Sequence, residues 1–98
     1  MSGKYIIYDK NGKGKEYDIY IDELIFEGEY LNGKRNGKGK EYYDGNILEF
    51  EGEYLNGQPN GKGKEYYHSG ELKFEGEYLN GKMWNGKGYN IMVILNLR

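Results

Sequence analysis

The chain alternates apolar or small residues with charged residues over short stretches. Residues 26–30 read Phe-Glu-Gly-Glu-Tyr, in which every second position is acidic. A period of two predicts a β-strand with one apolar face and one charged face. Residues 37–43, Gly-Lys-Gly-Lys-Glu-Tyr-Tyr, predict a second strand. The Asn-Gly steps between the two favour a turn because they tolerate positive φ.

The same pattern returns about every 24 residues, with nearly identical copies at 26–49 and 50–73. We therefore expect a single all-β domain in which stacked β-hairpins form one elongated, twisted antiparallel sheet. It should contain roughly eight strands and be about 35–40 Å long. Its units are a diverged N-terminal repeat (1–25), two regular repeats (26–49 and 50–73), a partial repeat (74–90) and an apolar C-terminal cap or strand (91–98).

Strand registers can be written from the turns. A two-residue turn at 44–45 places Gly39 opposite Phe50, Lys40 opposite Glu49 and Lys38 opposite Glu51. A turn centred on 33–34 places Glu29 opposite Lys38 and Glu27 opposite Lys40. Such cross-strand charge pairs contribute roughly 0.2–1 kcal/mol each. The expected charged face holds Glu27, Glu29, Lys38, Lys40, Glu49 and Glu51, with Tyr42 and Ile47.

The opposite face collects aromatic rings beside strand glycines, where a ring can cover the gap that a missing side chain leaves. Glu41 also falls on this face, and the pattern gives no reason for it. A single sheet encloses no core, so this face needs cover from curvature, a terminal segment or a second copy. Its expected members are Phe26, Gly28, Tyr30, Gly37, Gly39, Tyr43, Leu48 and Phe50.

The amino-acid composition favours β-strands and limits the classes of partner that the protein is expected to bind. The 98 residues include 17 Gly and 12 Tyr but no Ala, which disfavours helices and favours pleated surfaces. A net charge of −2 provides no basic field, so no nucleic acid partner is expected. The lack of Cys excludes disulfides and fits an intracellular, cytoplasmic setting. The first residues lack the pattern of a signal peptide, and the apolar run 91–95 is too short to span a bilayer.

The string from Phe26 to Gly39 resembles the MORN repeat, which opens with aromatic-x-Gly-x-aromatic, continues with x-Asn-Gly and closes with Gly-x-Gly. The match recurs at 50–63 and 74–88. The resemblance implies one β-hairpin per repeat in an elongated sheet. It also implies non-enzymatic roles: scaffolding, protein binding, dimerisation or association with membrane phospholipids. Related bacterial repeats occur in proteins described as antitoxins.

Candidate catalytic residues all have simpler interpretations. Residues 28–34 approach a phosphate-binding P-loop, but Arg35 stands where Ser or Thr would hold Mg²⁺. Carboxylate pairs recur in each regular repeat, whereas a catalytic acid needs a distinct environment. His68 is the only histidine and cannot build a metal site without other ligands. We expect no enzyme activity and no cofactor.

The expected function is therefore a non-enzymatic scaffold that binds another protein. Residues 84–97 are expected to form a cap over the aromatic face or a homodimer contact, since an uncovered apolar edge invites pairing with another chain. The candidate interaction surface consists of Phe26, Tyr30, Tyr43, Phe50, Tyr54, Tyr67, Phe74, Tyr78 and Trp84.

Two alternatives stay open. One is a peripheral phospholipid-binding module, in which each basic residue near an anionic surface contributes about 1 kcal/mol. Neighbouring glutamates would oppose this by neutralising the basic residues. The other is an antitoxin-like inhibitor that covers a bacterial toxin. The candidate contacts to lipid headgroups are Lys34, Arg35, Lys38, Lys62, Lys82 and Lys87.

Overall fold

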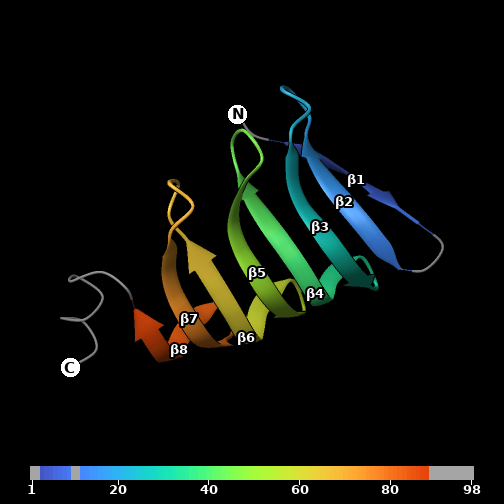
Figure 1. The fold of residues 1–98 in the computed structure, drawn as a ribbon. Coiled ribbons are helices and arrows are strands. Elements are labelled where there is room, and N and C mark those ends of the chain that lie inside the picture. The colour runs from blue at the N-terminus through green and yellow to red at the C-terminus, as the bar shows by residue number, and fades with distance from the viewer. Residues whose placement is uncertain (1–2, 10–11, 89–98) are drawn as a thin grey trace.

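The computed structural model describes residues 3–9 and 12–88, which form eight β-strands and no helix. Each strand pairs antiparallel with the next in chain order, so that they form one open sheet (Figure 1). The Cα atoms span 43 × 26 × 22 Å. This confirms the expected all-β array, while the cap expected at 91–98 lies outside the described residues. The strands are β1 (Lys4–Tyr8), β2 (Lys13–Asp18), β3 (Leu24–Leu31), β4 (Lys34–Tyr43), β5 (Ile47–Leu55), β6 (Gln58–Tyr66), β7 (Leu72–Leu79) and β8 (Lys82–Gly88).

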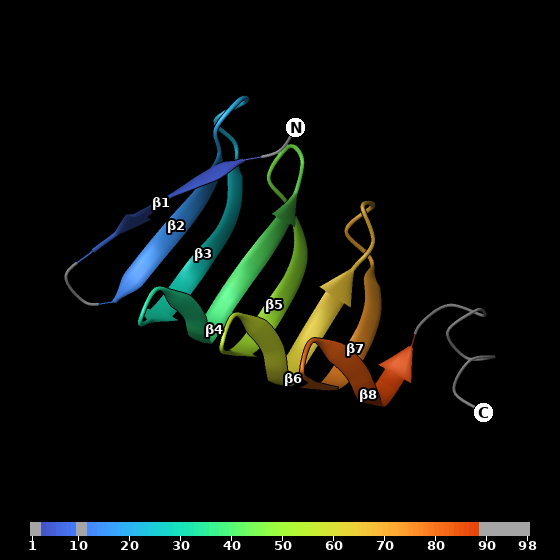
Figure 2. The ribbon, with the colours of Figure 1, turned by 180° about the vertical axis from the view of Figure 1, so that it is seen from behind.

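The connections lie at the two ends of the strands, on opposite sides of the sheet (Figure 2). The turns within the repeats lie together on one side, and the loops between repeats lie together on the other. The β3–β4 turn is centred on Asn32 and Gly33, one residue earlier than expected, and both have positive φ. We call residues 31–34, 55–58 and 79–82 the tips. A backbone hydrogen bond of 2.9 Å from Gly57 in the second tip to the carbonyl of Arg35 links that tip to the residue that follows the first tip, and Gly81 makes the same bond to Pro59.

The register between repeats differs by two residues from the expected one. The loop uses three residues, 44–46, and a bulge then separates Glu41 from Tyr42. Up to Glu41 the shift is an even number, so these residues keep the face that was expected for them. Beyond the bulge it is one residue, so Leu48 pairs with Tyr42 and Ile47 with Tyr43, and the faces expected for Ile47 and Leu48 were wrong. The observed pairs are Gly39–Gly52, Lys40–Glu51 and Lys38–Glu53, in place of Gly39–Phe50, Lys40–Glu49 and Lys38–Glu51.

Within the repeat, Glu27 pairs with Lys40 as expected. Glu29 pairs with Lys13 on β2 but has no partner on β4, because the β3–β4 pairing stops before it and resumes after it. Its carboxylate instead accepts a hydrogen bond of 2.7 Å from the backbone N–H of Lys38. The glutamate therefore satisfies a donor that the irregular ladder leaves without a backbone acceptor.

A column of seven aromatic rings lies on one face of the sheet, and its five buried rings form the core. Neighbouring ring centroids lie 5.0–5.7 Å apart with interplanar angles of 80–90°, which is edge-to-face packing. The most exposed of the three Phe rings, Phe50, keeps only 5% of its surface accessible. The aromatic face thus covers itself along the array. In order, the aromatic column is Tyr8, Tyr30, Phe26, Tyr54, Phe50, Tyr78 and Phe74.

Phe26 and Phe50 each lie on a pair of glycines from adjacent strands, and Phe74 lies on Gly86. A Cβ atom on Gly39 would lie 2.4 Å from Cζ of Phe26, and one on Gly28 would lie 2.9 Å from the same atom. Phe50 covers the equivalent pair in the next repeat. These contacts agree with the expectation that rings cover strand glycines. The glycines form an unbroken paired row, the glycine lane, made of Gly14, Gly28, Gly39, Gly52, Gly63, Gly76 and Gly86.

The tyrosines of the column explain the glutamate that the pattern left unexplained. The hydroxyl of Tyr54 donates a hydrogen bond of 2.5 Å to Glu41. Tyr78 makes the same contact with Glu65 at 2.9 Å. A buried hydroxyl needs a partner, and a carboxylate at this position of each repeat supplies one.

Glu49 was expected on the charged face, and this was wrong. Glu49 lies in the bulge, without a partner on β4, between the pairs Glu41–Phe50 and Tyr42–Leu48. Burial and then the carboxylates of Glu41 and Glu65, which accept hydrogen bonds from tyrosines of the aromatic column, raise the pKa of Glu49. Its counterparts in the other repeats agree: Ile25 packs against the core, and Lys73 lies 3.9 Å from Glu65. The bulge beside Glu41 is the physical reason, because an extra residue reverses the alternation locally.

Substitution of a lane glycine tests this packing. Gly39→Ala should lower the free energy of unfolding by about 1–3 kcal/mol, because the new methyl group must displace a buried ring. The measurement is urea denaturation, with Lys40→Ala, at an exposed neighbouring position, as the matched control. If the two variants were equally stable, ring-on-glycine packing would not limit the fold.

Candidate functional site

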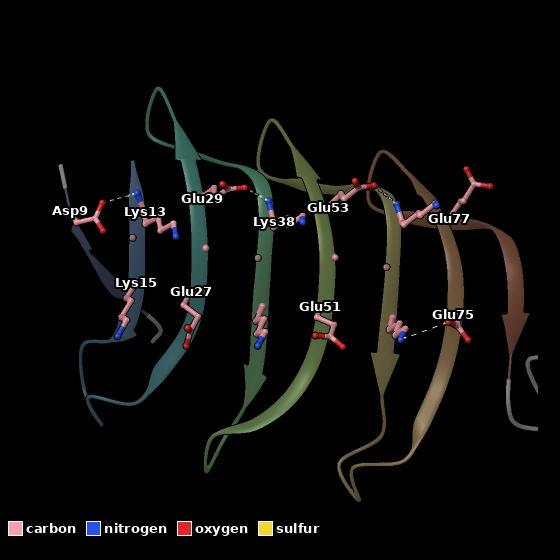
Figure 3. Close-up of a pocket in the computed structure, with 18 of the residues that line it drawn as sticks. Asp9, Lys13, Lys15, Glu27, Glu29, Lys38, Glu51, Glu53, Glu75 and Glu77 are labelled. Carbon is pink, nitrogen blue, oxygen red and sulfur yellow. Dashed lines mark hydrogen bonds and ion pairs between the residues drawn. The ribbon is translucent and has the colours of Figure 1, made fainter. Parts of the chain in front are cut away.

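The charged face of the sheet is hollowed into a trough that crosses the strands (Figure 3). Its volume is about 1220 Å³, and its lining extends from β1 to β7. The glycine lane runs between two rows of charged side chains. The tip-side row is Lys13, Glu29, Lys38, Glu53, Lys62 and Glu77, and the loop-side row is Lys15, Glu27, Lys40, Glu51, Lys64 and Glu75.

Each strand contributes one sign of charge to both rows. Strand β4 presents Lys38 and Lys40, and its neighbour β5 presents Glu51 and Glu53. The same holds along the trough, with lysines on β2, β4 and β6 and glutamates on β3, β5 and β7. The sign of the charge therefore changes at every strand, which is about every 4.8 Å.

Hydrogen bonds fix the carboxylates of the trough in place. In the tip-side row, Glu53 accepts from the backbone N–H of Lys62 at 2.7 Å, as Glu29 does in the repeat before. In the loop-side row, Glu51 accepts from the hydroxyl of Tyr66 at 2.6 Å. Burial and then the glutamate raise the pKa of Tyr66 to about 12, so this hydroxyl stays protonated and donates.

The lysines of the trough are less constrained than the glutamates. Lys64 lies 3.9 Å from Glu75, a long ion pair between half-exposed groups. Such pairs in water contribute little. Among residues 3–9 and 12–88, no ion pair within 4.0 Å involves the ammonium groups of Lys15, Lys38, Lys40 and Lys62. The trough thus combines fixed anions with cations that can still take a partner.

The aromatic residues that the sequence predicts as an interaction surface differ in their exposure to solvent. Tyr30, Tyr43 and Tyr67 are half-buried. Trp84, on β8, is 63% exposed. The other five lie in the core, where a partner cannot reach them without unfolding the column: Phe26, Phe50, Tyr54, Phe74 and Tyr78.

The six residues proposed as lipid contacts lie in different parts of the structure. Lys34 and Lys82 are exposed on the tips. Lys38 and Lys62 belong to the trough. Lys87 lies on β8 opposite a glutamate. The sixth residue, Arg35, turns to the aromatic face instead.

Arg35 is part of a buried ionic cluster at the start of the array. Its guanidinium group lies 4.1 Å from the centroid of the Phe26 ring. It donates two hydrogen bonds, of 2.8 and 2.9 Å, to the carboxylate of Glu16, which is 1% exposed. Lys4 and Tyr30 donate to the same carboxylate. The arginine therefore stabilises the fold and is not available to a headgroup.

The protonation of Glu16 follows from these contacts. Burial alone would raise its pKa, but the hydrogen bonds from Arg35, Lys4 and Tyr30 outweigh it and lower the pKa to about 2. Sequence reasoning missed this residue. The only signal was a glutamate between a glycine-lysine step and a tyrosine, which also occurs in the regular repeats.

The candidate metal ligands do not gather in the described part of the chain. No group of three or more His, Cys, Asp and Glu side chains there is arranged for a metal ion. His68 is exposed and lies beside the ring of Tyr43, with centroids 5.2 Å apart. No helix in the described ranges is long and apolar enough to cross a membrane.

Comparison with known protein families shows a match to one repeat family. The family model described as the MORN repeat matches residues 26–47, 50–71 and 74–88, more than half of the chain. Each match begins at a phenylalanine of the aromatic column. No curated protein matches the chain.

The Glu16 cluster gives a pH dependence of stability. A folded pKa of about 2 means that the charged group stabilises the fold above the unfolded pKa of about 4.5, by about 3 kcal/mol. This contribution should be lost as the pH falls from about 4.5 through 2. Unfolding free energies of the wild type and Glu16→Gln, measured across this range, should converge at low pH. Glu71→Gln, at an exposed site, is the control and should follow the wild type. A constant difference between wild type and Glu16→Gln would contradict the assignment.

Proposed function

Because the chain belongs to the MORN-repeat family, whose repeats occur in protein- and membrane-interaction modules, we propose that it is a non-enzymatic scaffold that binds another protein along the trough. The trough carries the proposal. It is continuous across seven strands, and both of its walls are made of charged side chains. A surface of this extent fits a chain segment better than a small molecule, which would be enclosed on most sides.

The order of the trough supports binding without large rearrangement. Its glutamates are held by Tyr hydroxyls and backbone N–H groups, and its floor is a paired row of strand backbone. A surface that is already ordered loses little conformational entropy when a partner binds. The exposed lysines would supply charge-assisted hydrogen bonds to such a partner.

Selection from a random-peptide display library against the immobilised protein tests this function. We expect the selected peptides to lose binding to the variant Lys38→Glu/Lys40→Glu. They should keep binding to the matched variant Lys34→Glu/Lys82→Glu, which changes the net charge equally at the tips. Thermal melting should show that both variants fold. Peptides that depended on the tips, or a selection without any binder, would overturn binding in the trough.

A second candidate function, association with an anionic lipid surface, is favoured by one observation. The tips present Leu31, Leu55 and Leu79 to solvent, with 58%, 48% and 53% of each exposed. Exposed Lys34 and Lys82 lie beside them, and no acidic residue occurs in 30–36, 54–60 or 78–85. Apolar side chains next to cations suit a headgroup region.

Flotation with liposomes that contain anionic lipid tests this candidate. Binding through the tips should fall as salt rises. It should be lost in Lys34→Glu/Lys82→Glu but retained in Lys38→Glu/Lys40→Glu. A triple variant, Leu31→Ser/Leu55→Ser/Leu79→Ser, should weaken flotation at every salt concentration. Absence of flotation at low salt would remove the lipid candidate and leave the protein-binding one.

A further inference from the structure

The charge pattern of the trough restricts the shape of a partner, provided that the trough is the binding site proposed above. Along the stack the sign alternates strand by strand, from the lysines of β2 to the glutamates of β7. A complementary partner must therefore present charges of alternating sign about every 4.8 Å along its length. It must also be straight over several strands, so that side chains of both rows can reach it.

We propose that the trough binds an α-helix lying across the strands, with acidic and basic side chains alternating at each turn on the face that it presents. A helix advances about 5.4 Å per turn, so that successive turns come to lie over successive strands. Across the four strand steps from β2 to β6 the accumulated mismatch is about 2.4 Å. Flexible lysine and glutamate side chains can absorb a mismatch of this size.

An extended segment fits the same pattern less well. Its side chains on one face recur about every 6.6–6.8 Å, because alternate residues point away. Over the same four steps its charges would drift by about 7–8 Å, which is more than one strand. Like charges would then meet between the second and third of the four steps. The strand spacing, and not the composition of the trough, therefore selects a helix over an extended chain.

The two rows add a second requirement. Lys38 and Lys40 point into the trough from either side of the glycine lane on one strand. A carboxylate above the lane can thus approach two ammonium groups at once, and a basic residue one turn along can approach Glu51 and Glu53. Both ends of such a contact are charged, and such hydrogen bonds are stronger than neutral ones. The partner's helix axis accordingly follows the lane.

The test uses two alanine-based helical peptides of identical composition. In the first, the presented face alternates Glu and Lys at successive turns. In the second, two turns of Glu are followed by two turns of Lys. Circular dichroism should confirm that the two peptides are equally helical.

Fluorescence anisotropy at low salt should show that the alternating peptide binds about tenfold tighter or more, and this preference should shrink as salt rises. Lys38→Glu/Lys40→Glu should abolish the preference, and Lys34→Glu/Lys82→Glu should leave it intact. The milder pair Lys38→Gln/Lys40→Gln covers any loss of folding in the first.

The outcomes separate this inference from the proposed function. Equal affinity of the two peptides, with both lost in Lys38→Glu/Lys40→Glu, would overturn the charge register while the trough remained the binding site. Failure of both peptides, beside library peptides that depend on the trough, would overturn the helical partner alone. Peptide binding that the trough variants left unchanged, together with a library selection that found no trough binder, would overturn both proposals.

Discussion

The packing of a phenylalanine ring on two paired strand glycines is the contact on which the rest of this structure depends. A single sheet has no second layer to bury its apolar side, so an ordinary sheet of this size would leave that side exposed to solvent. Here Phe26 reaches almost zero exposure because Gly28 and Gly39 let the ring lie directly on the backbone. Tyr54 of the next repeat then closes over the edge of that ring at 5.1 Å between centroids. Each repeat is thus incomplete until its neighbour is present, which is the basis of array stability.

The same contact sets the geometry of the opposite face. The paired glycines fix the register, and the register brings the lysine strands β4 and β6 each between two glutamate strands. The rings, the glycines and the charges are three consequences of one alternating sequence. Because the strands of such a scaffold are evenly spaced, the charges on its surface recur at a constant interval. A partner is then selected by the spacing of its own charges. The proposed helical partner follows from that interval.

The N-terminal end of the array departs from the regular pattern near the start of the aromatic column. At the first full repeat, Arg35 covers Phe26 and bridges Glu16 and Glu41. Its counterparts are Pro59 and Met83, which cannot make an ion pair. The cluster therefore ties the diverged N-terminal hairpin to the first regular repeat. Breaking one partner of so buried a group leaves an uncompensated charge, which is costly.

The sequence by itself determined the strands, the order of the hairpins, the Asn-Gly turns and the two faces. Each of these depends on local periodicity, which a 24-residue repeat states several times. Tertiary structure decided the two-residue shift between repeats, because bulges and a three-residue loop depend on how neighbouring strands meet. It also decided that Tyr54 and Tyr78 are core residues and that Arg35 faces inward. Burial of these side chains arises from the next repeat along the stack, and no local pattern specifies which ring will be covered.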